Sequence, residues 1–104
     1  MVGRPDISEQ LPGAQALRLA KTIILEGSVV FTRHAREEME KDDLLETDVV
    51  NTVSGGVINE PGELGHRGDW CYQVRTSRAT VVILFRGVEE MVVVTAWREQ
   101  RRGR

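Results

Sequence analysis

The spacing of the apolar residues changes near Val57, and this change constrains the fold of the 104-residue chain more than any other feature. Before Val57, apolar side chains recur at helical intervals, whereas after it they alternate as they do in strands. The segments of the strand-like part are joined by short connections, which favour an antiparallel meander. Helices followed by such a run of strands predict an α+β domain in which the helices pack on one face of the sheet.

Three helices are expected in the first half of the chain. The first covers residues 12–26, with Gly27 as its stop, and the second runs from a capping Thr32 to about Lys41. The third begins at Thr47 or Asp48 and ends at the glycine pair 55–56, since glycine tolerates the conformations that follow a helix. Residues 28–31 are short and β-branched, so they predict a brief strand or an extended link.

The second half predicts four strands in one mostly antiparallel sheet. They are expected at residues 57–60, 70–77, 80–86 and 91–98. Residues 63–69 are polar and rich in glycine, which indicates a hairpin loop. The last two strands are apolar on both faces near their middle, so they are expected to be central and largely covered. The chain fits one domain, with residues 1–10 as a flexible lead-in and 99–104 as a basic tail.

Composition narrows the class of protein. The net charge is −2, but residues 35–65 carry two basic and nine acidic groups, whereas residues 66–104 carry eight arginines and four acidic groups. The second region could attract an anionic partner, although a solvated surface explains it as well. No apolar run is long enough to span a bilayer, and the single cysteine, Cys71, allows no paired-cysteine zinc site. We therefore expect a cytoplasmic protein with no membrane contact, no metal and no cofactor.

The helix start near His34 is the first candidate for chemistry. His34 lies between Arg33 and Arg36 where free backbone amides favour anions, so it could act as a base or donate to a phosphate. The alternative is structural, because Glu38 lies four residues further on and could pair with His34 on the helix surface.

The loop before the strand at residues 70–77 offers a second candidate. His66 and Arg67 lie there among glycines, and loops on a rigid scaffold often carry functional groups. A plain hairpin loop would have the same polar composition.

The strands offer a third candidate. Alternation along residues 70–75 separates Trp70, Tyr72 and Val74 from the set Cys71, Gln73 and Arg75. If the second face is open, a cationic surface would form across neighbouring strands, with an aromatic side chain on which a base could stack. Its members would be Gln73, Arg75, Arg86 and Arg98, with Trp97 as the stacking group. The alternative places Trp70, Tyr72 and Trp97 in the core.

The stretch from Val30 to Arg98 resembles a small bacterial family, domain of unknown function 4258. The likeness rests on the segment His34–Met39, which reads His-Ala-Arg-x-x-Met, on the helix ending near Gly56, and on the aromatic–arginine end at Trp97-Arg98. That family looks like a relative of the RelE-, MqsR- and BrnT-like toxins. The resemblance therefore implies a RelE/barnase-like toxin fold, with helices packed on a four-stranded sheet.

The same resemblance implies a function. It indicates the toxin of a bacterial toxin–antitoxin system, a metal-independent endoribonuclease that acts on RNA and is neutralised by an antitoxin protein. A base, an acid and a cation would be needed. The implied catalytic residues are His34, Tyr72 and Arg75, with Arg36 or Arg86 as the alternatives for the cation. The implied substrate-binding residues are Arg33, Arg36, His66, Arg67, Arg86, Trp97 and Arg98.

A function of another class remains open. The chain could be a non-catalytic binding module, such as an antitoxin, an immunity protein or a subunit. In that case its acidic helical region, residues 35–65, would mask a basic protein partner.

Overall fold

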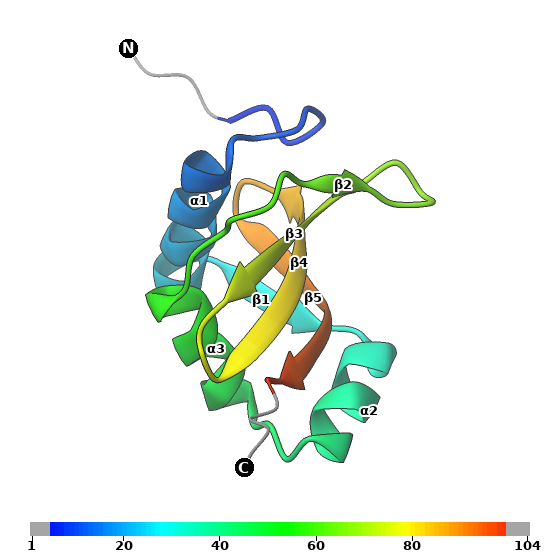
Figure 1. Ribbon diagram of the computed structural model, residues 1–104. Coiled ribbons are helices and arrows are strands. Elements are labelled where there is room, and N and C mark those ends of the chain that lie inside the picture. The colour runs from blue at the N-terminus through cyan, green and yellow to red at the C-terminus, as the bar shows by residue number, and fades with distance from the viewer. Residues whose placement is uncertain (1–4, 100–104) are drawn as a thin grey trace.

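The computed structural model describes residues 5–99, which form three helices and five strands in an α+β domain (Figure 1). The elements in chain order are α1 (Gly13–Glu26), β1 (Ser28–Phe31), α2 (Arg33–Lys41), α3 (Glu46–Gly55), β2 (Glu63–Leu64), β3 (Trp70–Arg75), β4 (Ala79–Gly87) and β5 (Glu90–Arg98). The α+β class and all three expected helices are confirmed. The third helix begins at Glu46, slightly earlier than expected, with Leu45 as its N-cap. The Asp48 carboxylate accepts a hydrogen bond from the Leu45 amide at 2.8 Å, which stabilises the first turn at this earlier start.

The sheet has five strands rather than the four expected from the sequence, in the order β1-β5-β4-β3-β2. The segment 28–31 is a true strand, and it pairs in parallel with the first half of β5. The expected strand at 57–60 was wrong, since only Val57 bridges β3, opposite Arg75. The chain then leaves the sheet because Ile58 lies close against Gly13 at the start of α1. The expected hairpin loop instead contains β2, whose two residues pair with the start of β3.

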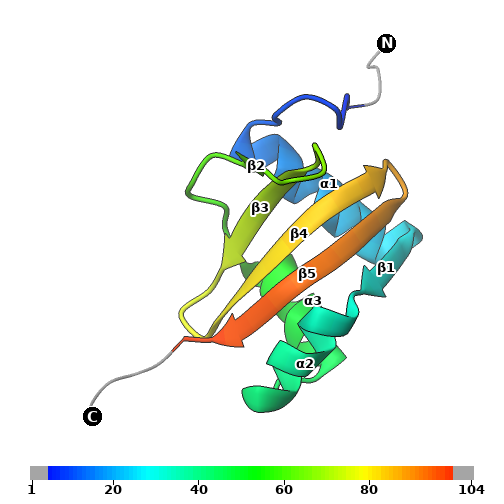
Figure 2. The same cartoon turned by 90° about the vertical axis from the view of Figure 1, so that its right-hand side faces the viewer.

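Helices α1 and α3 cover one face of the sheet, which we call the inner face (Figure 2). The side chains that the sheet contributes to this core are Tyr72, Val74, Ala79, Val81, Ile83, Phe85, Met91, Val93 and Ala96. The expectation that the two longest strands are central is confirmed for β4 and β5. Their outer face is not fully covered, because Val82 and Leu84 remain partly exposed there.

Helix α2 lies beside the second half of β5 and extends the sheet layer where β1 ends (Figure 2). Ala35 and Met39 form its buried side, as their four-residue spacing predicted. Thr32 is the N-cap, as expected: its hydroxyl accepts from the Ala35 amide at 2.9 Å and donates to the Val94 carbonyl at 3.2 Å. A single side chain thus closes the helix and attaches it to β5.

Substituting Thr32 by alanine is expected to lower the free energy of unfolding by about 1 kcal/mol, because a helix cap and a bond to the sheet are both lost. Urea denaturation followed by circular dichroism measures the change. Thr22→Ala is the matched control, since Thr22 is exposed within α1 and its hydroxyl bonds only the Arg18 carbonyl of the same helix. Equal stabilities of the two variants would contradict the role given to Thr32.

The described part of the expected lead-in makes contacts with the rest of the domain. The Trp70 indole donates to the Ser8 carbonyl at 3.2 Å, and the Gln10 amide donates to the Gly62 carbonyl at 2.8 Å. Residues 1–4 of the lead-in and 100–104 of the expected basic tail lie outside the described residues. No helix within residues 5–99 is long and apolar enough to cross a membrane.

Candidate functional site

Residues that face each other across β3, β4 and β5 form rows on the outer face of the sheet, because directly opposed residues of paired strands point the same way. One row consists of Arg75, Thr80 and Trp97, and the next consists of Gln73, Val82 and Thr95. A third row, closest to β2, consists of Cys71, Leu84, Val92 and Val30. The outer face is therefore mostly apolar in the row closest to β2 and polar at the end that carries Arg75.

A β-bulge in β5 places Trp97 on this outer face. Val82 pairs with Thr95 but Ile83 pairs with Val93, so Val94 is an extra residue on the β5 side. Strict alternation from the inward-facing Val93 would have sent Trp97 into the core. The bulge reverses the alternation beyond it, so that Ala96 is buried and Trp97 lies opposite Thr80, partly exposed.

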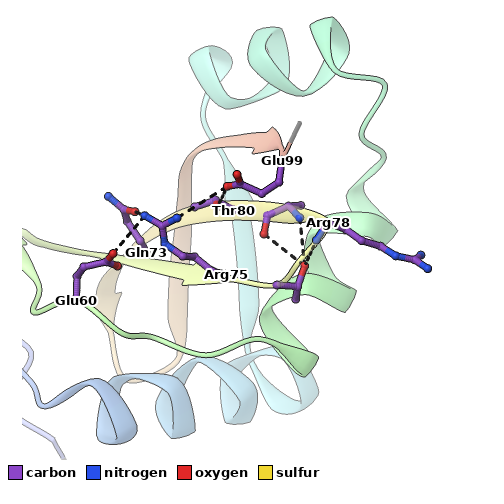
Figure 3. Close-up of polar contacts among 8 residues, drawn as sticks. Glu60, Gln73, Arg75, Arg78, Thr80 and Glu99 are labelled. Atoms are coloured by element: carbon purple, nitrogen blue, oxygen red, sulfur yellow. Dashed lines mark hydrogen bonds and ion pairs between the residues drawn. The ribbon is translucent and has the colours of Figure 1, made fainter. Parts of the chain in front are cut away.

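At the polar end, the Arg75 guanidinium lies among acceptor groups of Glu60, Gln73 and Glu99, which come from three segments of the chain (Figure 3). We call these residues, together with Thr80, the Arg75 cluster. Its Nη2 donates to Gln73 Oε1 at 2.9 Å and lies 3.3 Å from Glu60 Oε2. Its Nη1 lies 4.0 Å from Glu99 Oε2, and this same oxygen accepts a hydrogen bond of 2.5 Å from the Thr80 hydroxyl. One guanidinium therefore faces two carboxylates on a half-exposed surface.

The backbone holds the Arg75 cluster in place. Arg75 exchanges two backbone hydrogen bonds with Val57, of 2.8 and 3.0 Å, which fix the end of β3. The Glu99 amide donates to the Arg78 carbonyl at 2.8 Å and so extends the pairing of β5 with the β3–β4 turn. Thr80 is fully buried, which leaves its hydroxyl no solvent partner in place of Glu99. Gln73 and Glu99 are thus positioned by β3 and by the end of β5, whereas Glu60 reaches the cluster from the segment between α3 and β2.

This arrangement can bind a phosphate and can move a proton. A guanidinium that lies against carboxylates presents the same planar donors to phosphate oxygens. The Glu99 carboxylate is held beside that position, with one oxygen committed to Thr80. A carboxylate in such a place can accept a proton from a bound hydroxyl group.

Helix α2 carries three of the residues singled out from the sequence. His34 is exposed at its start, on the far side of β4 and β5 from Arg75. Arg33 lies 3.7 Å from Glu37, on the helix surface. Arg36 forms a 2.7 Å ion pair with Glu46 and stacks over the Phe31 ring at 5.1 Å. Both flanking arginines are therefore already paired with carboxylates of their own region.

Tyr72 lies on the opposite face of the sheet from Arg75. Its side chain is 1% exposed, and its hydroxyl accepts a hydrogen bond from the Leu11 amide at 2.9 Å. Burial raises the pKa of this phenol. The structure therefore does not bring together His34, Tyr72 and Arg75, the three residues implied to be catalytic: they occupy a helix, the inner face and the outer face.

The remaining predicted binding residues are dispersed. His66 and Arg67 are exposed in the β2–β3 loop, at the opposite end of β3 from Arg75, roughly 16 Å along the strand. Arg86 lies near the far end of β4, 3.8 Å from Glu90. Arg98 turns toward the α2–α3 loop, where its guanidinium donates to two backbone carbonyls. Of the cationic surface expected on the sheet, Gln73, Arg75 and Trp97 share the open polar end.

Three members of the site were missed from the sequence, namely Glu60, Thr80 and Glu99. Glu60 was expected in a strand that does not form, and Glu99 was expected in a tail. A signal for Thr80 did exist, because it is the one hydroxyl residue in a nine-residue strand that is apolar apart from Arg86. Among residues 5–99, no group of three or more histidine, cysteine or acidic side chains is placed to hold a metal ion.

The fold and this site define a small α+β domain with helices on one face of its sheet and a polar cluster on the other. A family model described as "Domain of unknown function (DUF4258)" matches residues 31–98, from the end of β1 to the end of β5. The chain belongs to this family. No curated protein and no solved structure matches the chain.

Proposed function

We propose that this protein is the toxin-like component of a bacterial toxin–antitoxin system and a metal-independent endoribonuclease, with the outer face of its sheet as the RNA-binding surface. The observation that carries the proposal is the pairing of Arg75 with Glu99 on an open face that also carries Trp97. The resemblance to RelE-like toxins supplies the substrate class, and the cluster supplies the chemistry.

In cleavage of RNA through the ribose 2′-hydroxyl, a base takes the proton of that hydroxyl and a cation binds the phosphate. The 2′-oxygen then forms a bond to phosphorus while the bond from phosphorus to the 5′-oxygen breaks, and the departing 5′-oxygen takes a proton from solvent at the open face. We assign the role of base to the Glu99 carboxylate and the phosphate contact to the Arg75 guanidinium. Glu99 Oε2 and Arg75 Nη1 lie 4.0 Å apart. An entering phosphate would replace Glu60 at Arg75 Nη2. Trp97, one strand beyond Thr80, is available to stack on a neighbouring base.

The locations of His34 and Tyr72 support this choice of base. His34 is separated from Arg75 by two strands, and the Tyr72 hydroxyl is buried against Leu11. Neither group can reach a phosphate bound at Arg75 without a rearrangement of the sheet. His34→Ala is therefore expected to keep RNA cleavage within about threefold of the wild-type rate, an effect typical of residues outside the reacting centre.

Glu99→Gln is expected to slow RNA cleavage by at least about 100-fold, because the amide keeps the Thr80 contact but cannot take a proton. The assay uses the full chain, a fluorescent single-stranded RNA and EDTA, with the products resolved on a gel. Glu89→Gln is the matched control, since Glu89 is an exposed carboxylate in the β4–β5 turn. Arg75→Lys is expected to slow cleavage as well, whereas Arg78→Lys, on the exposed neighbouring turn, is not.

The outcomes separate the two classes of function. Cleavage by the wild-type chain that is lost in Glu99→Gln, and retained in Glu89→Gln with equal melting temperatures, supports the proposal. Undetectable cleavage by the wild-type chain, or an undiminished rate in Glu99→Gln, overturns it. In cells, inducible expression of the wild-type chain should arrest growth and degrade total RNA, and expression of Glu99→Gln should not. Normal growth under wild-type induction would favour a non-catalytic binding module.

A further inference from the structure

We infer that the hollow between α2 and α3 is a docking surface for a basic, amphipathic segment of a protein partner. The hollow has a volume of about 370 Å³ and lies at the turn between the two helices. Its lining combines the apolar side chains of Met39, Leu44 and Leu45 with the carboxylates of Glu40, Asp43 and Glu46 and with one basic side chain, Arg36. None of them belongs to the Arg75 cluster, so this inference goes beyond the proposed RNA activity and can fail or succeed independently of it.

The floor of the hollow is apolar and already formed. Met39 and Leu44 are almost fully buried beneath it, at 4% and 5% exposure. Leu45, the next residue, is 68% exposed beside them. Leu45 also lines the hollow, so the apolar floor continues from the buried pair out to the surface. An aliphatic group of a partner could therefore contact Leu45 and continue down to the buried pair.

The rim of the hollow selects a positively charged occupant. Between Arg33 and Asp48 the chain carries seven acidic and three basic residues. Two of the basic residues are already paired at close range, since Arg36 lies 2.7 Å from Glu46 and Lys41 lies 3.0 Å from Glu38. The rim therefore keeps an excess of negative charge, to which a lysine or arginine beside an aliphatic anchor is complementary and an RNA phosphate is not.

The wall of the hollow is held by the sheet. The Arg98 backbone amide donates to the Asp42 carboxylate at 2.7 Å, and its guanidinium donates to the carbonyls of Asp42 and Asp43 at 3.0 and 2.9 Å. Asp43 has a φ of 56°, and this left-handed turn redirects the chain between α2 and α3. A surface fixed in this way loses little conformational freedom when a partner binds.

The test uses the isotope-labelled full chain and two synthetic helical peptides of Leu and Lys or of Leu and Glu, with the same leucine pattern. Titration followed by NMR is expected to give saturable amide shifts in residues 36–46 with the lysine peptide and none with the glutamate peptide. Leu45→Ala is expected to weaken lysine-peptide binding about tenfold, as loss of an interface anchor does. Leu25→Ala is the matched control, because Leu25 is 82% exposed on α1, outside the hollow.

Shifts confined to residues 36–46, weakened by Leu45→Ala and unchanged by Leu25→Ala, support the docking surface. Glu40→Gln should also weaken binding, and part of the affinity should persist in 0.5 M salt through the apolar contact. Absence of saturable shifts, shifts spread over every acidic region, or an affinity unchanged by Leu45→Ala overturns the inference. RNA cleavage measured on the same variants is expected to be unaltered, so a failure of the proposed RNA activity would be seen separately.

Discussion

Gly56→Ala is expected to destabilise the domain by about 3 kcal/mol and to lower its melting temperature by more than about 10 °C. A β-carbon on Gly56 would lie 2.5 Å from the Thr52 carbonyl oxygen, 2.8 Å from the Arg75 carbonyl oxygen and 2.9 Å from a methyl group of Val74. Two of these atoms are backbone, so no rotamer change can relieve the overlap. Glycine is required at position 56 because there is no room for a β-carbon. The backbone conformation does not require it, since a φ of −93° is accessible to any residue.

Gly55→Ala is the matched control, since no heavy atom lies within 4 Å of a β-carbon added there. Alanine at this position, the last of α3, is expected to leave stability unchanged or to raise it by up to about 1 kcal/mol. Thermal and urea denaturation of the two variants measure the difference. A Gly56→Ala protein as stable as Gly55→Ala would show that α3 and β3 are less closely packed than the structure indicates.

The same contact connects stability to the candidate site. Gly56 packs on the backbone of Arg75, and the next residue, Val57, forms the bridge that ends β3. A displacement of α3 would therefore move the strand end that carries the guanidinium. We expect Gly56→Ala to disturb the Arg75 cluster even under conditions in which the variant remains folded.

The elements that the sequence predicted well are those defined by local signals. Each helix could be read from apolar spacing together with a cap or stop, such as Thr32 or the glycines at 55–56. β2 was missed, and residues 28–31 were expected as either a brief strand or an extended link, because neither strand carries a strong local signal. β1 has four residues and depends on a parallel partner some 60 residues away in the chain, and β2 has only two residues. Pairing over such distances in the chain is set by the tertiary structure and leaves little trace in the local pattern.

In the candidate site, too, local sequence signals predicted some features, whereas tertiary structure determines the others. Alternation along β3 correctly placed Gln73 and Arg75 on one face and Tyr72 on the other. Which face is open, and what lies beside Arg75, depends on the register of three strands and on the bulge at Val94. A single extra residue reverses the facing of Trp97, so strict alternation could not have placed it. Glu60 and Glu99 reach the cluster from outside the strands, where alternation carries no information.

Tyr72→Phe is expected to lower the free energy of unfolding by about 2 kcal/mol, because the buried Leu11 amide would lose its only hydrogen-bond partner among residues 5–99. Gln10→Ala is the control, since it removes a bond of an exposed side chain to the neighbouring Gly62 and should cost less than about 0.5 kcal/mol. Urea denaturation near neutral pH measures both changes.

The dependence of stability on alkaline pH provides a second test of the role of Tyr72. Burial raises the pKa of the Tyr72 phenol above its ordinary value of about 10, so the folded chain keeps this proton to higher pH than the unfolded chain. The contribution of the neutral phenol to stability is therefore complete below pH 10 and is lost as the pH rises above it. The stability gap between wild type and Tyr72→Phe should narrow in that range. If Tyr72→Phe instead retained full stability and lost RNA cleavage, the phenol would be catalytic, as the toxin resemblance implied, and the assignment of the reaction to the outer face would be wrong.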